Sequence, residues 1–268
     1  MNNAFYGLSC NPFDKHSLKV KDRFESNDFR QMTDRLNFLK DVNGIGVFTA
    51  PPGMGKSFAL RCFCRSLNAS LHMMRYVCLS TVSVAEFYKQ LCEELGLDAK
   101  GGKTVMFKAI QERVFHLFKE KRCPLILAID EAQYLNAGIL KDLKMLMNYQ
   151  FDSLNCFALI LSGEPVLNFT LEKPVNEALK QRVTVHYNFS GLSPDEVSGY
   201  LAHKIALAGG SKTILGQDAL AAIASFCHGN PRAIDNLMSD ALMLGAQLGQ
   251  QTIDGETIMA AANAQALG

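Results

Sequence analysis

The order of apolar and polar positions divides the chain into two parts. Up to about residue 190, short apolar runs alternate with segments whose apolar residues recur at helical spacing. After Gly191 the helical spacing continues, and no further strand pattern occurs. The expected strands are 44–50, 71–80, 125–129, 156–162 and 182–189. The expected helices are 27–41, 56–67, 84–95, 104–121, 137–149 and 175–181, then one opening at Ser193, 217–227, 231–248 and 254–266.

Apolar strands separated by helices are typical of a parallel sheet whose two faces are both covered. The pattern therefore predicts an α/β nucleotide-binding domain over residues 1–190. It predicts a smaller, all-helical domain over residues 191–268.

Composition and charge narrow the class of protein. The chain has 268 residues, of which 27 are basic and 26 acidic, so its formal net charge is only +1. No global field recruits nucleic acid, and any DNA contact must come from a local patch or an assembled ring. The N-terminus lacks a signal-peptide pattern, and no window holds the ~18 apolar residues of a membrane span. Eight cysteines without a C-x-x-C pair indicate reduced core thiols, so we expect a cytoplasmic protein without direct membrane insertion.

The stretch APPGMGKS, residues 50–57, lies between an expected strand and an expected helix. This is the context in which a glycine-rich loop binds phosphate, because the glycines let backbone N–H groups turn toward the anion. Lys56 would reach the β- and γ-phosphates, and Ser57 would hold Mg²⁺. Ala50 departs from the commonest loop pattern, but it ends a strand and needs no positive φ. The expected nucleotide contacts in the loop are Pro52, Gly53, Met54, Gly55, Lys56, Ser57 and Phe58.

A carboxylate pair ends the most apolar expected strand, in LILAIDEAQ. Asp130 would orient the water shell of Mg²⁺, and Glu131 would act as the base that polarises the attacking water. Phosphoryl chemistry needs such a pair beside a phosphate-binding loop. The pair and the loop together predict an ATPase rather than a protein that only binds nucleotide.

Ser162 ends another strand, in CFALILSGEP, and would sense the γ-phosphate there. The alternative is that Ser162 caps the following helix, and the neighbouring Glu164 is a second candidate for the sensing role.

Two arginines complete the candidate site. Arg182 precedes the last strand and could reach a neighbouring subunit's nucleotide as an arginine finger; the alternative is an ion pair with Glu177. Arg232, in HGNPRAIDNL, could report the nucleotide state from the helical part. Its alternative is a local ion pair with Asp235.

These elements in this order resemble AAA+ ATPases over the whole chain. The segments FYGLSCNPF, APPGMGKS, LAIDEAQYL, LILSGEP, LKQRVTVHYNFSGLS and GNPRAIDNL resemble the ExeA-like group, which is related to the TniB, TnsC and IstB helper ATPases of transposons. The resemblance implies a P-loop fold with a five-stranded parallel sheet in the order 5-1-4-3-2, followed by a helical lid. It also implies that the FYGL…NPF segment and the helix that follows it line the adenine pocket.

By the same resemblance, Lys56 and Ser57 form Walker A, and Asp130 and Glu131 form Walker B. Ser162 is nearest the first sensor, Arg182 is the finger and Arg232 is the second sensor. The chain departs from the group at Glu164, where many relatives read G-Q-P.

The function expected from the resemblance is ATP hydrolysis in a transposition helper. It would assemble as a ring or helical filament on double-stranded DNA, select a target site and engage a transposase. The alternative is a secretion or envelope-assembly ATPase that acts through a separate membrane partner, and a third class is a regulatory NTPase switch. The end at NAQALG, without an apolar run, favours a stand-alone helper. Candidate contacts to the DNA backbone are Lys100, Lys103, Lys141 and Lys144, whose alternative is solvated lysines without a partner.

Overall fold

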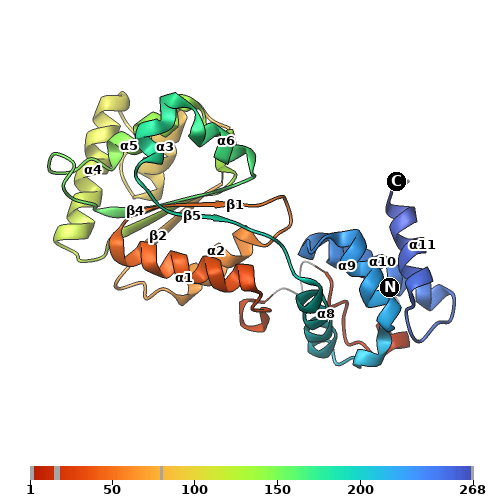
Figure 1. The fold of residues 1–268 in the computed structure, drawn as a ribbon. Helices are drawn as coiled ribbons and strands as arrows, with labels where there is room; N and C mark the ends of the chain where they lie inside the picture. Colours follow the sequence, from red (N-terminus) through yellow and green to blue (C-terminus); the bar gives the residue numbers. More distant parts are fainter. Residues whose placement is uncertain (1–2, 15–18, 79–80, 267–268) are drawn as a thin grey trace. The chain divides into compact units, whose positions relative to one another are not determined.

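The structure, a computed structural model, describes residues 3–14, 19–78 and 81–266 (Figure 1). The chain divides into two compact units. The α/β unit comprises residues 31–52 and 56–189. The helical unit comprises the residues up to 30, residues 53–55 and the residues from 190 onward.

The α/β unit is built on a five-stranded sheet in which all neighbouring strands are parallel. The strands lie in the order β2-β3-β4-β1-β5. Read from the other edge, this is the predicted order 5-1-4-3-2, which is therefore confirmed. The strands are β1 (Ile45–Thr49), β2 (Met73–Val77), β3 (Leu125–Ile129), β4 (Phe157–Gly163) and β5 (Val183–Asn188).

The three central strands are buried along their whole length, as their continuous apolar runs predict. The edge strands differ, because each has a neighbour on one side only. β5 alternates between partly buried and exposed residues, and most of β2 is only partly buried. Of the strand expected over 71–80, residues 79–80 lie outside the described part.

Helices cover both faces of the sheet (Figure 1). α1 and α2 lie on one face, and α3, α4 and α5 lie on the other. The helix α6 was not predicted, and in place of the helix expected over 175–181 a 3-10 turn at Pro174–Asn176 leads into α7. The helices are α1 (Asn27–Val42), α2 (Lys56–Ser66), α3 (Val84–Glu94), α4 (Lys103–Lys119), α5 (Ala137–Leu146), α6 (Val166–Glu172) and α7 (Glu177–Lys180).

Close packing at β1 depends on a glycine. A Cβ at Gly46 would lie 2.2 Å from the Cδ1 atom of Leu39 on α1 and 2.9 Å from a ring atom of Phe48. Leu39 and Phe48 are both fully buried. The missing side chain therefore lets α1 approach the strand that leads into the loop over residues 50–57.

The helical unit contains the four helices expected after Gly191, together with the N-terminal segment. Tyr6, Leu8 and Phe13 belong to the same apolar core as these helices. The backbone N–H of Ser9 donates to the carbonyl of Ala208 at 2.9 Å. The helices are α8 (Pro194–Leu207), α9 (Gln217–Cys227), α10 (Pro231–Gln247) and α11 (Gly255–Ala266).

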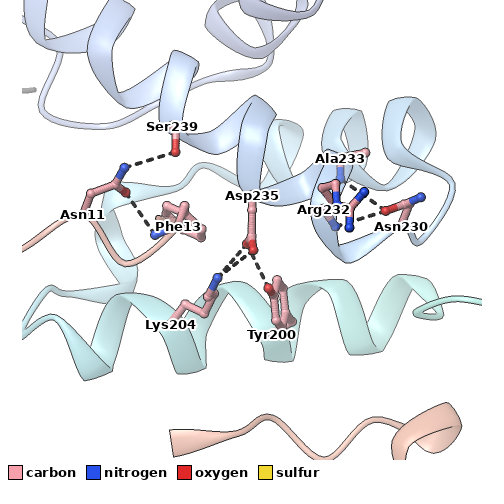
Figure 2. Close-up of polar contacts among 9 residues, drawn as sticks. All are labelled: Asn11, Phe13, Tyr200, Lys204, Asn230, Arg232, Ala233, Asp235 and Ser239. Carbon is pink, nitrogen blue, oxygen red and sulfur yellow. Dashed lines mark hydrogen bonds and ion pairs between the residues drawn. The ribbon is translucent and has the colours of Figure 1, made fainter. Parts of the chain in front are cut away.

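The predicted domain boundary needs a correction at the N-terminus. The residues up to 30 group with the helical unit rather than with the α/β unit. The physical reason is the apolar N-terminal side chains, which are buried among α8 to α11. Figure 2 shows a polar contact of the same segment, in which Asn11 Nδ2 donates to Ser239 Oγ at 3.2 Å.

A buried ion pair links two helices of this unit (Figure 2). Lys204 Nζ on α8 lies 2.8 Å from each carboxylate oxygen of Asp235 on α10. The Tyr200 hydroxyl also donates to Asp235, at 2.8 Å. Burial raises the pKa of Asp235, an effect that the lysine and the hydroxyl oppose, and burial lowers the pKa of Lys204.

No helix in the described part of the chain is long and apolar enough to cross a membrane. All eight cysteines are free thiols, and four of them are buried, as expected for core cysteines. Cys10, Cys64 and Cys78 are exposed instead.

Candidate active site

The loop between β1 and α2 has the backbone conformation that its glycines predict. Gly53 and Gly55 have φ angles of 88° and 93°, in the left-handed region that favours glycine. Lys56 begins α2 and is buried, and its ammonium group donates to the carbonyls of Ala50 at 2.7 Å and Pro51 at 3.3 Å. A cation and a helix N-terminus thus meet at the loop, which is an arrangement suited to phosphate.

Asp130, at the end of β3, is the centre of a hydrogen-bond network. Its Oδ2 accepts from Ser57 Oγ at 2.6 Å and from the Tyr76 hydroxyl at 2.7 Å. Its Oδ1 accepts from Ser162 Oγ at 2.8 Å and from the Glu131 backbone N–H at 3.1 Å. Burial by itself would raise the pKa of Asp130, but these four donors hold the pKa below its usual value. The carboxylate is therefore ionised and oriented.

Tyr76 is a site residue that the sequence analysis missed. It lies one residue before the end of β2, where it pairs with Ala128 of β3. Burial and the neighbouring Asp130 carboxylate raise the pKa of Tyr76, so its hydroxyl stays a donor. The sequence does show a tyrosine near the C-terminal end of an expected strand. This position indicates a site residue only when the order of the strands is known.

Glu131, the predicted base, begins the turn after β3. It has a left-handed backbone, with φ 52° and ψ 36°. Its Oε2 accepts a hydrogen bond from Gln133 Nε2 at 2.7 Å, and Gln133 Oε1 accepts one from the backbone N–H of Glu164 at 3.0 Å. Gln133 is the second residue that the sequence analysis missed, although it stands in the quoted LAIDEAQ motif.

The two candidates for the sensing role at the end of β4 differ in their contacts. Ser162 is fully buried and its hydroxyl meets Asp130. Glu164 contacts the network through its backbone N–H. The alternative role of Ser162 as a helix cap is wrong, because Pro165 stands at the N-cap of α6 and gives it no side-chain cap.

Arg182, just before β5, forms an ion pair with Asp152 of the same chain. The Glu177 carboxylate accepts instead from Gln181 Nε2, at 3.1 Å. The alternative partner expected for Arg182 is therefore wrong, whereas its role as a finger stays a prediction.

Arg232 is the second residue of α10 in the helical unit and is exposed. Its backbone N–H donates at 3.0 Å to Asn230 Oδ1, which caps the helix (Figure 2). The alternative ion pair with Asp235 is wrong, because Asp235 is paired with Lys204. The sensing role of Arg232 stays a prediction.

Two of the four lysines expected at DNA have acidic partners. Lys100 lies 2.7 Å from Asp98, and Lys103 lies 2.6 Å from Asp142. The alternative of solvated lysines without a partner is thus wrong for these two. Lys141 and Lys144 lie on α5, one exposed and the other partly buried.

The residues of the site fit Mg²⁺ bound together with nucleotide. In the described part of the chain, no group of three or more His, Cys, Asp or Glu residues could form an all-protein metal cage. Mg²⁺ needs none, because it keeps several waters and uses one or two protein ligands together with phosphate oxygens. The Ser57 hydroxyl and the Asp130 carboxylate, in mutual contact beside the loop, are suitable ligands.

Comparison with known proteins agrees with this geometry. Residues 40–171 match the family model described as an AAA domain. The solved structure of Cdc6p from Pyrobaculum aerophilum has a TM-score of 0.65, with 17% identity over 94% of this chain and 68% of that chain. The chain has the AAA+ P-loop fold.

Two further solved structures and one sequence relative extend the comparison. The ORC1 protein of Aeropyrum pernix, solved in complex with DNA, has a TM-score of 0.64, with 17% identity over 94% of this chain and 68% of that chain. The RuvB Holliday junction branch migration motor of Thermotoga maritima has a TM-score of 0.59, with 15% identity over 92% of this chain and 73% of that chain. General secretion pathway protein A of Aeromonas hydrophila is 29% identical over 250 residues, which cover 92% of this chain. The chain spans only 45% of that relative's length.

Proposed function

We propose that this chain binds Mg²⁺-ATP at the loop before α2 and hydrolyses it. The observation that carries the proposal is the buried, ionised Asp130, which accepts a hydrogen bond from Ser57 at 2.6 Å. It is followed directly by a glutamate, and Lys56 begins α2 directly after the adjoining loop. Cation, metal ligands and base are the parts that phosphoryl transfer to water requires.

Each residue has a distinct role in this proposal. Lys56 and the loop N–H groups bind the phosphates, and Ser57 and Asp130 hold the metal. When bound, Mg²⁺-ATP supplies the phosphoryl group that water attacks. Glu131 accepts the proton of that water.

The other candidate roles concern sensing and charge. Ser162 links the end of β4 to Asp130, so we propose it as the first sensor in preference to Glu164. Arg182 of a neighbouring copy and Arg232 supply positive charge to the phosphates.

Replacing Lys56 tests nucleotide binding. Lys56→Ala removes the cation of the loop, so we expect ATP affinity to fall at least about 100-fold, the loss of a charge-assisted contact to phosphate. A fluorescent ATP analogue measures the affinity. Lys108→Ala, an exposed lysine on α4, is the matched control and should bind as wild type does. Unchanged affinity in Lys56→Ala would place the nucleotide elsewhere.

Replacing Glu131 tests hydrolysis separately. Glu131→Gln keeps the size of the side chain but removes its basicity, so kcat should fall about 100- to 10,000-fold while ATP affinity is retained. Phosphate release at saturating ATP measures kcat. If this variant turned over ATP at the wild-type rate, Glu131 would not be the base.

The process that uses the ATP has two candidates. The transposition hypothesis, with assembly on double-stranded DNA and recruitment of a transposase, rests on the sequence motifs. A secretion or envelope-assembly role, through a separate membrane partner, is favoured by the similarity to General secretion pathway protein A.

One experiment separates these candidates. Electron microscopy of Glu131→Gln with ATP, with and without duplex DNA, should reveal DNA-dependent rings or filaments if the transposition hypothesis holds. DNA should then also stimulate the wild-type ATPase, in a manner that salt suppresses. No assembly on DNA and no stimulation would overturn the transposition hypothesis.

A further inference from the structure

A single glutamine side chain connects the predicted base to the end of β4. Gln133 lies in the 3-10 turn Ala132–Tyr134 that follows the carboxylate pair. Its Nε2 donates to Glu131 Oε2 at 2.7 Å, and its Oε1 accepts from the Glu164 N–H at 3.0 Å. Because both ends of one planar amide are engaged, the orientation of Gln133 is defined from two sides.

Gly163 makes room for this amide. A Cβ at Gly163 would lie only 2.6 Å from Gln133 Oε1. A real Cβ does not approach an oxygen so closely, so any larger residue at the end of β4 would displace the Gln133 side chain. The bridge from the turn to β4 therefore depends on a residue without a side chain.

The hydrogen bond from Gln133 bears on the orientation of Glu131. The residue is exposed, and this bond restricts the rotamers that its side chain samples. A hydrogen bond from a neutral amide selects one orientation and cannot take up the proton itself. A carboxylate has two oxygens, so a bond at Oε2 is compatible with proton acceptance at Oε1.

We infer that Gln133 is a positioning residue for hydrolysis. It holds the Glu131 carboxylate toward the attacking water and ties that orientation to the strand end where Ser162 contacts Asp130. The inference rests on the proposed ATPase function. It implies that a shift at the end of β4 is transmitted to the base through one side chain.

Two variants break the bridge in different ways. Gln133→Met keeps the length of the side chain but removes its amide, and Gly163→Ala keeps Gln133 but displaces its Oε1. Misplacing the base should lower kcat about 10- to 100-fold in each, with KM and the affinity for a fluorescent ATP analogue unchanged. Gln111→Met is the matched control, because Gln111 is also partly buried and donates to a carbonyl, that of Asn148, from α4. It should keep the wild-type kcat.

A coupling experiment distinguishes positioning from general damage to the fold. If Gln133 acts through Glu131, then Gln133→Met should lower the residual rate of Glu131→Gln by less than about twofold. Independent damage would lower that rate by the same factor as in wild type.

A spectroscopic readout does not depend on activity. The backbone amide proton of Glu164 should shift upfield and exchange faster in both Gln133→Met and Gly163→Ala, and neither change should occur in Gln111→Met. NMR of isotope-labelled protein measures both effects.

The outcomes separate this inference from the proposed function. An active wild-type protein, with both variants at the wild-type kcat, would overturn the inference alone. Equal losses from Gln133→Met with and without Glu131 would also overturn it. A correctly folded wild-type protein that binds ATP but never hydrolyses it would overturn the proposed function, and the positioning role with it.

Discussion

At the scale of single residues, the site is organised by one carboxylate. Asp130 is 2% exposed and accepts from four donors, which come from α2, β2, β4 and its own turn. Hydrogen bonds to a charged group are stronger than those between neutral groups. The four hydrogen bonds therefore fix the orientation of the carboxylate that we propose as a metal ligand.

The contribution of Tyr76 to this network can be measured. Tyr76→Phe removes one donor to an ionised carboxylate, so the free energy of unfolding at pH 7 should fall by about 1–2 kcal/mol. The bond stabilises the ionised form, and the folded pKa of Asp130 lies below its usual 3.8. Its contribution is thus present at neutral pH and lost as the pH falls through that folded pKa. Urea unfolding at a series of pH values measures it.

A second tyrosine provides the control. Tyr134 is 55% exposed, so Tyr134→Phe should leave the unfolding free energy unchanged within about 0.5 kcal/mol. A loss in Tyr76→Phe that stayed constant down to acid pH would show that the hydroxyl does not act through the Asp130 carboxylate.

Sequence reasoning could identify some residues of this site and not others. Lys56, Ser57 and Asp130 belong to short motifs in which the neighbouring residues already indicate the chemical role of each side chain. Tyr76 and Gln133 do not, because their roles depend on contacts across the sheet. Tyr76 reaches Asp130 only through the parallel register of β2 on β3, and Gln133 reaches Glu164 only because β4 lies beside β3.

At the scale of elements, continuous apolar runs predicted the central strands well. Residues 125–129 were expected as a strand, and β3 has the same bounds. α6 was missed because it has only seven residues, and its exposed Val166 and Phe169 obscure the helical pattern of its buried positions. Short helices stabilised mainly by tertiary contacts leave little periodicity to detect.

The pairing of α8 with α10 can be tested through their buried ion pair. Lys204→Met leaves the Asp235 carboxylate buried without its cation, so the helical unit should lose about 3–5 kcal/mol. The double variant with Asp235→Leu should recover most of this loss. Hydrogen exchange of α8 and α10 measures the stability of these helices.

The same single variant has a defined pH dependence. Without Lys204, the folded pKa of Asp235 rises further above its unfolded value, since burial already raises it. Protonation then relieves the buried charge, so the deficit of Lys204→Met should be smaller near pH 4 than at pH 7. As a control, Lys40→Met removes a cation whose partner, Asp41, is exposed, and should cost less than about 1 kcal/mol. A pH-independent deficit in Lys204→Met would contradict the assignment to Asp235.

At the scale of the whole molecule, the chain begins and ends in the same unit. Phe13 is buried in the core of the helical unit, with its ring 5.4 Å from the Lys204 ammonium group. The sequence could not predict this, because the partners are separated by nearly the whole α/β unit. The resemblance to AAA+ ATPases instead predicted that the N-terminal segment lines the adenine pocket.

Truncating Phe13 tests which unit depends on the N-terminal segment. Phe13→Ala should destabilise the helical unit by about 3–5 kcal/mol, through lost burial and the cavity left behind. Hydrogen exchange should show the loss in α8 to α11 and leave the β-sheet unchanged. Phe169→Ala, which truncates an exposed phenylalanine, is the control and should change neither unit. Equal loosening of the sheet would mean that the segment supports both units.

The buried N-terminal segment sets the order in which the protein can fold during synthesis. Tyr6, Leu8 and Phe13 are made before the α/β unit, but the helices that bury them follow residue 190. At ~5–20 residues per second, these side chains wait roughly 10 to 40 seconds for their partners on the ribosome. The sheet and its helices are made within that interval and can fold in it. The helical unit closes last, and until then a chaperone that binds apolar segments has access to its N-terminal part.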